Sequence, residues 1–280
     1  MTQFWSLMGT AFAASIVMAP LHALMGLHVV RRGIIFIDLA IAQVAALGVA
    51  LAVYRGYEAT SFQTMATGFG FAIMGALLFA LTRFRPPQVP HEAIIGIVFV
   101  IAQAVGILVL ARTAHGLEEL RNLLTGSILV VEAEEVARIL GWYVIILIAF
   151  VILWKPTTLL STESPKAPQG VWAVIYDFLF YALIGVMVTW SVRVAGVLVV
   201  FTWLVMPAVC AFLFTESILT AVGIAIAVTI VSSFGGLLLS YHADLPTGEA
   251  MVAFYGLMVA LLYVIRLALQ RRLIPKKPAG

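Results

Sequence analysis

Two apolar runs of this chain carry the polar residues best suited to chemistry. Asp38 and Gln43 lie in RRGIIFIDLAIAQVAALGVALA, and His91 and Glu92 open HEAIIGIVFVIAQAVGILVL. A carboxylate inside an apolar membrane helix costs about 2.5–3.5 kcal/mol on insertion scales, so Asp38 should face a protein interior or a wet cavity. Carboxylates, amide oxygens and imidazoles bind divalent metal ions. Asp38, Gln43, Glu92 and His91 are therefore candidate residues of a metal-ion path.

Each candidate also has a purely structural interpretation. Asp38 could pair with Arg31 or Arg32, which precede it by a few residues. His91 and Glu92 could be ordinary polar residues at a membrane interface. His22, inside the first apolar run, could hydrogen-bond a neighbouring helix or ligate a metal ion.

Several kinds of catalytic and cofactor chemistry are disfavoured by missing motifs. The sequence has no G-x-x-x-x-G-K-[ST], which cradles ATP phosphates, and no G-x-S-x-G. His91-Glu92 begins like H-E-x-x-H, but position 95 is isoleucine. The single cysteine, Cys210, supports neither a disulfide framework nor a thiolate cluster. We expect no enzyme activity and no covalently bound cofactor; any ATP would be bound by another subunit.

The composition places these residues in a membrane protein. Of the 280 residues 63% are hydrophobic and 10% charged, with a mean hydropathy of +1.12, whereas a soluble domain has about 25% charged residues. The basic residues form short clusters between apolar runs, which is typical of cytoplasmic loops and excludes a nucleic-acid partner. We predict an all-α, polytopic transmembrane bundle in which residues 1–280 form a single permease domain.

The apolar runs define the spans, because about 20 apolar residues cross the hydrocarbon core. The predicted spans are 5–29, 33–54, 61–82, 93–111, 139–154, 171–190, 194–214, 217–240 and 250–268. Residues 116–137 are ambiguous, since LLTGSILVV is too short to cross and EAEEVAR is too acidic for lipid. This segment could be a re-entrant or interfacial helix, so the count lies between eight and ten spans.

Loop charges predict the orientation in a bacterial plasma (inner) membrane. With the N-terminus outside, eleven Lys and Arg residues fall inside and five outside, as the positive-inside rule requires, and the C-terminus is cytoplasmic. The longest inside connection, residues 155–170, is either a docking surface for a partner or a plain loop. The absence of repeated intramembrane acids beyond Asp38 argues mildly against proton coupling.

Five segments resemble the zinc/manganese/iron permease family of ABC importers. GLHVVRRGIIFIDLAIAQVAALGVALA is similar to its second-span signature, and Ile95-Gly96 matches a recurrent Ile-Gly. LLTGSILVV resembles Leu-x-Gly-x-Ile-Leu, and SVRVAGVLVVFTWLVMPAVCA resembles Val-Gly-Val-Leu-Leu-Val followed by Leu-x-x-Pro-Ala. DLPTG (Asp244 to Gly248) is similar to Asp-x-Pro-x-Gly before the last helix. The five matches keep their order along nearly the whole chain.

The resemblance implies the permease subunit of an importer for zinc, manganese or iron. It implies a homodimer, two copies of a separate ABC ATPase subunit inside, and an extracytoplasmic metal-binding protein outside. It also implies a metal pathway near the dimer axis, built partly from the second helix. The alternatives are a secondary transporter or channel without an ATPase partner, an ABC permease for a non-metal cargo, and a non-transporting scaffold.

One departure from the family lies in the second helix. When the segments are aligned through Leu47-Gly48, the family's metal-contacting aspartate falls on Leu39 and its histidine on Gln43. Asp38 is therefore one residue, or about 100° of helix, from the expected place. We expect this permease to hold its cargo differently or more weakly, with Gln43 as a neutral oxygen donor.

Overall fold

The computed structural model describes residues 2–59, 61–83, 89–112, 126 and 128–273, and in these residues the chain is helical without a strand. The helices are α1 (Thr2–Arg31), α2 (Ile37–Tyr54), α3 (Phe62–Thr82), α4 (His91–Leu110), α6 (Ala133–Ser161), α7 (Val171–Ala195), α8 (Val197–Phe212), α9 (Ile218–Ala243) and α10 (Thr247–Leu273), with a short 3-10 turn, η1 (Ile128–Val130). Each of the nine predicted spans coincides with one of these helices.

Eight of these helices are long and apolar enough to cross a membrane. The exception is α8, whose 16 residues give a length of about 24 Å, less than the roughly 30 Å of a hydrocarbon core. It follows α7 after Gly196 alone, which has φ 81°. The predicted polytopic all-α fold is confirmed.

Several predicted boundaries are wrong, including those of α2 and α6. Helix α2 begins at Ile37 rather than at residue 33, because residues 32–36 form a turn in which Gly33 has φ 64°. Helix α6 begins at Ala133 and continues to Ser161, so the loop expected at 155–170 is shortened to 162–170. Glu134 and Glu135 lie in the first turn of α6, where the helix dipole stabilises acidic side chains. Residues 116–125 lie outside the described part.

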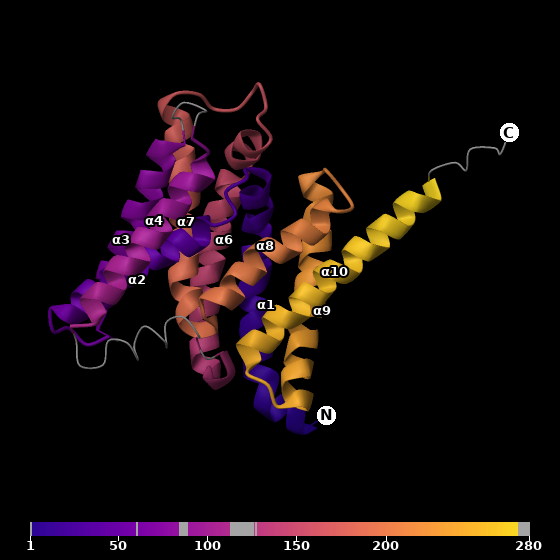
Figure 1. The fold of residues 1–280 in the computed structure, drawn as a ribbon, viewed down its shortest axis with the longest axis horizontal. Coiled ribbons are helices and arrows are strands. Elements are labelled where there is room, and N and C mark those ends of the chain that lie inside the picture. Colours follow the sequence, from indigo (N-terminus) through magenta and orange to yellow (C-terminus); the bar gives the residue numbers. More distant parts are fainter. Residues whose placement is uncertain (1, 60, 84–88, 113–125, 127, 274–280) are drawn as a thin grey trace.

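The helices form two groups (Figure 1). On one side α2 packs against α3 and α4, and α3 packs against α7. On the other side α1 packs against α8 and α9, and α10 packs against α9 and α8. Helix α1 also contacts α6, and α6 contacts α7, so α1, α6 and α7 join the groups. The start of α1 and the end of α10 lie at opposite ends of the bundle.

Glycines allow the closest helix contacts. A Cβ atom on Gly26 would lie 1.7 Å from the backbone oxygen of Leu204, so α1 and α8 touch backbone to backbone. A Cβ on Gly236 would lie 2.6 Å from the Cα of Met251, and one on Gly235 would meet the ring of Phe254. Small residues permit such approaches in membrane bundles, where dispersion contacts drive helix association. The Gly235-Gly236 pair therefore packs α9 against α10.

Candidate functional site

Asp38 is buried at the start of α2 with no hydrogen-bond partner. The sequence suggested a position inside an apolar helix. In the structure Asp38 is the second residue of α2, so it lies in the first turn of the helix. Only 1% of it is exposed, and both carboxylate oxygens lack a hydrogen bond. The start of the helix therefore stabilises the charge only partly.

Glu92 brings a second carboxyl group to the same place. Its Oε1 accepts a hydrogen bond of 3.0 Å from the backbone N–H of Phe36, which immediately precedes α2. Its Oε2 is buried and has no hydrogen-bond partner. Phe36 precedes Asp38 by two residues, so this hydrogen bond places the Glu92 carboxyl group at the same helix start as Asp38. The turn at 32–36 and the first turn of α4 thus bring together two of the four candidate residues.

The other two candidates face elsewhere. His91 Nε2 lies 3.0 Å from the backbone oxygen of Phe79 and 3.3 Å from Thr82 Oγ1, so this imidazole is turned towards α3. Gln43 is buried at 5% exposure, but five helical residues separate it from Asp38, which corresponds to about 140° of rotation and about 7.5 Å of rise. The metal-binding role of all four residues stays a prediction.

Neither arginine that was considered as a partner for Asp38 binds it. Arg31 Nη1 donates a 2.8 Å hydrogen bond to the backbone oxygen of Glu216. Arg32 Nη1 donates to Asp177 Oδ1 at 2.7 Å. The pairing of Asp38 with Arg31 or Arg32 is therefore wrong.

Asp177 in α7 is the centre of a buried ion cluster that we did not predict. Its carboxylate, 0% exposed, accepts hydrogen bonds from Arg32 and from Arg83. Arg32 also donates to Ser161 Oγ at 2.8 Å and lies 4.5 Å from the ring centre of Phe180. We call Arg32, Arg83 and Asp177 the Asp177 cluster. Asp177 is the single acid in the apolar run VWAVIYDFLFYALIG, and a single acid in an apolar run was also the feature that identified Asp38. Asp38 is therefore not the only acid within a predicted span.

His22 has a structural environment. Its Nδ1 lies 3.0 Å from the backbone oxygen of Met18, and its Nε2 lies 3.0 Å from Ser191 Oγ in α7. The predicted hydrogen bond to a neighbouring helix is confirmed. Within the described residues, no group of three or more His, Cys, Asp and Glu side chains could hold a metal ion. A metal ion at Asp38 and Glu92 would therefore be bound by no more than two His, Cys, Asp or Glu side chains of the described residues.

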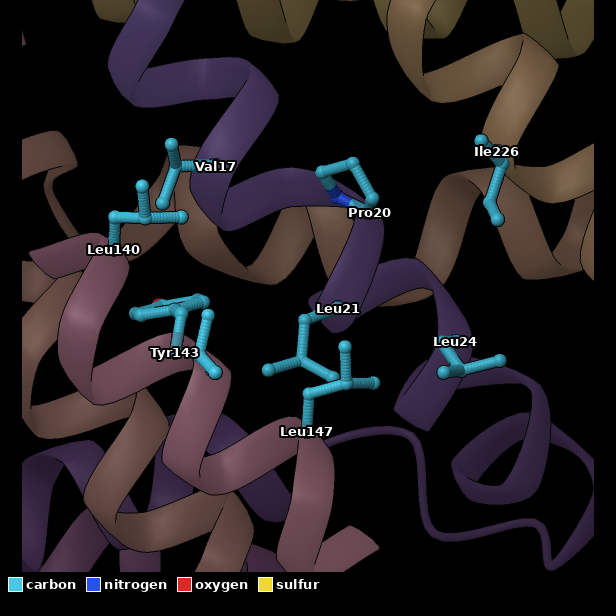
Figure 2. Close-up of a pocket in the computed structure, with 9 residues that line it drawn as sticks. Val17, Pro20, Leu21, Leu24, Leu140, Tyr143, Leu147 and Ile226 are labelled. Atoms are coloured by element: carbon cyan, nitrogen blue, oxygen red, sulfur yellow. The ribbon is translucent and has the colours of Figure 1, made fainter. Parts of the chain in front are cut away.

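The cavity of about 220 Å³ between α1, α6 and α9 is unsuited to an ion (Figure 2). Its lining is aliphatic apart from Tyr143, and the side chains of α1 and α6 face each other across it. The lining residues are Val17, Pro20, Leu21, Leu24, Leu140, Tyr143, Val144, Leu147 and Ile226. A charged cargo would lose its hydration there without gaining ligands.

The comparison with known families decides the membership of the chain. A model described as the ABC 3 transport family matches residues 5–270. The chain belongs to the ABC 3 transport family. The match covers all five motifs, so it confirms the resemblance found in the sequence.

Individual relatives of this ABC 3 family member include proteins named as metal transport system membrane proteins. The "Probable iron transport system membrane protein" of Haemophilus influenzae is 25% identical over 178 residues, which are 63% of each chain. The "Manganese transport system membrane protein MntC" of Halalkalibacterium halodurans is 24% identical over 264 residues, 92% of this chain and 87% of that protein. The structure "PsaBC from Streptococcus pneumoniae in complex with Fab" superposes with a TM-score of 0.74 at 19% identity, over 94% of this chain and 95% of that chain. The fold is shared along nearly the whole length.

Proposed function

We propose that this ABC 3 family member is the permease subunit of an ATP-driven importer for divalent metal ions, namely zinc, manganese or iron. The observation that carries the proposal is the family match over residues 5–270. Two relatives with similar sequences are named as iron and manganese transport proteins. Both oxygens of Asp38 and Oε2 of Glu92 are buried without a hydrogen-bond partner, so they add a further polar site to the bundle.

The working assembly would contain two permease chains, two ATPase subunits and a metal-binding protein. The ATPase would dock on the loop 162–170 between α6 and α7, which lies at the same end of the bundle as the Asp177 cluster. The metal-binding protein would deliver cargo at the opposite end. The excess of Lys and Arg near the loop 162–170 supports a cytoplasmic location for that end, with the N-terminus outside.

Reconstitution tests this proposal. The chain is purified with a candidate ABC ATPase and placed in liposomes, and uptake of radioactive Zn²⁺, Mn²⁺ and Fe²⁺ is measured with the binding protein present. We expect uptake of at least one ion that requires ATP and is lost with an ATPase variant that cannot hydrolyse it. Uptake by the permease alone would instead indicate a secondary transporter or channel. ATP-driven transport of a different cargo, without any metal uptake, would refute the metal assignment.

A further inference from the structure

We propose that Asp177 is a positioning residue that couples the loop 162–170 to the rest of the bundle through the Asp177 cluster. This inference rests on the proposed function, in which a partner ATPase docks on that loop. It specifies which side chains of this chain carry a movement of the loop to α2.

The Asp177 cluster joins four helices at one end of the bundle. Asp177 lies in the second turn of α7, which follows the loop. Arg32 follows the end of α1, and Arg83 follows the end of α3. Both guanidinium groups donate to the Asp177 carboxylate. The ends of α1, α3 and α6 and the start of α7 lie at this end of the molecule (Figure 1).

The same two arginines bind the end of α6, which leads into the loop. Arg32 Nε donates to Ser161 Oγ at 2.8 Å, and its Nη2 donates to the backbone oxygen of Thr157 at 3.2 Å. Arg83 Nη2 donates to the backbone oxygen of Leu160 at 3.2 Å, in the last turn of the helix, where carbonyl groups lack partners of their own. Each guanidinium thus holds the residues before the loop and the acid after it. A displacement of the loop therefore strains these contacts.

The loop has a defined conformation and an accessible surface. Ser164 N–H donates to the backbone oxygen of Leu159 at 3.1 Å, and Glu163 between them has φ 49°. This is the usual way in which a helix ends at a left-handed residue. Pro165 and Pro168 restrict the backbone further. Most residues of the loop are exposed, so a partner can contact the loop and move it as a unit.

Arg32 extends the connection to α2. It is the first residue of the turn 32–36, which leads directly into α2 at Ile37. The backbone N–H of Phe36 at the end of this turn donates to Glu92 Oε1 of α4 at 3.0 Å. Because the turn is short and held at both ends, movement of Arg32 reaches the starts of α2 and α4.

Stability alone does not explain three buried or partly buried charges at this position. Charges lose their hydration on burial, and apolar residues of similar volume often give equal or greater stability. A hydrogen-bonded ion cluster instead depends strongly on distance and angle, so it fixes how the helices that carry it meet. Replacing all three charges with apolar side chains therefore separates coupling from stability.

The test compares metal uptake with ATP hydrolysis in the complete transporter, reconstituted in liposomes with its ATPase and binding protein. Uptake is measured for whichever of Zn²⁺, Mn²⁺ and Fe²⁺ the wild type transports fastest. The main variant combines Arg32→Met, Arg83→Met and Asp177→Leu, which leaves none of the three charges unpaired. Arg83→Gln breaks half of the cluster, and Arg83→Lys keeps the positive charge. Glu134→Gln removes an exposed pair with Arg138 at the opposite end of α6 and is the control.

We expect the triple variant to be as stable as the wild type. It should hydrolyse ATP within about twofold of the wild-type rate and take up about tenfold less metal per ATP, a factor typical of coupling between distant sites. Arg83→Gln should lie between the triple variant and the wild type, and Arg83→Lys should restore part of the loss. Glu134→Gln should match the wild type in both rates.

Backbone hydrogen exchange gives a readout that a purely structural role would not change. A non-hydrolysable ATP analogue bound to the partner should alter exchange in the loop 162–170 and in the turn 32–36 of the wild type. In the triple variant the change should stay within the loop. An equal change at the turn in both proteins would overturn the proposal.

The remaining outcomes separate the coupling from the proposed function. Wild-type uptake per ATP in a stable triple variant would refute the role of the cluster but keep the proposed function. Losses of hydrolysis and uptake in equal proportion would also refute that role, since the cluster would then serve folding or assembly. If the triple variant does not fold, Arg83→Gln decides: uncoupling supports the proposal, and wild-type coupling refutes it. Absence of any ATP-dependent metal uptake in the wild type would refute the proposed function itself.

Discussion

The Asp177 cluster offers the sharpest test of the packing at this end of the bundle. Replacing Asp177 with asparagine keeps the size of the side chain and one acceptor oxygen but removes the negative charge. Two arginines then lose their counter-ion in a buried environment. Breaking a buried pair by removing one partner typically costs about 3–5 kcal/mol, because an uncompensated charge is left behind.

The two arginines should contribute unequally to this cost. The side chain of Arg32 is 2% exposed and that of Arg83 is 21% exposed. Arg83 can turn its guanidinium towards water, because long basic side chains reach the surface easily. Arg32 keeps its hydrogen bonds to Ser161 Oγ and to the backbone oxygen of Thr157. We therefore expect Asp177→Asn to lower the free energy of unfolding by about 3 kcal/mol, the lower end of that range.

The assay is reversible unfolding of the purified permease in mixed micelles, titrated with a denaturing detergent and followed by tryptophan fluorescence. Glu134→Gln is the control, since it removes an exposed pair with Arg138 at 3.6 Å that should contribute less than about 0.5 kcal/mol. If the free energy of unfolding of Asp177→Asn equals that of Glu134→Gln within error, the buried charges do not stabilise one another and the reasoning fails. Recovery of stability when Arg32→Met is added would support it.

Two further predictions use the same unfolding assay. Gly26→Ala places a methyl group against the backbone of α8 and should lower the free energy of unfolding by about 1–3 kcal/mol because of overpacking. Gly223→Ala has no atom within 4 Å of the added Cβ, so it should be neutral or raise the free energy of unfolding by up to about 1 kcal/mol. Equal behaviour of the two alanine variants would contradict the backbone contact. Ser191→Ala removes the group 3.0 Å from the buried Nε2 of His22 and should cost about 1–3 kcal/mol, more than Thr189→Ala, whose hydroxyl binds only a carbonyl of its own helix. A smaller loss in Ser191→Ala than in Thr189→Ala would show that the bond between α1 and α7 is unimportant.

The sequence by itself determined the membrane location and the nine apolar runs that form helices in the described residues. Both depend on the length and apolarity of continuous runs, which are properties of a one-dimensional pattern. The family resemblance was also available, because its motifs are local. Isolated polar residues such as Asp38 were recognisable for the same reason, since an acid in an apolar run is costly wherever it lies. Asp177 carries the same signal in the run VWAVIYDFLFYALIG.

Only the tertiary structure decided which polar groups meet. Asp177 binds Arg32 across 145 positions, and Glu92 binds the backbone of Phe36 across 56 positions. Those pairs depend on how α1, α4 and α7 pack, and no local pattern in the sequence specifies which helices meet. The turn that delays the start of α2 until Ile37 is likewise held by α4 and α8. Asp38 and Glu92 could therefore be named from the sequence, but their meeting depends on contacts between helices that the chain reaches only when folded.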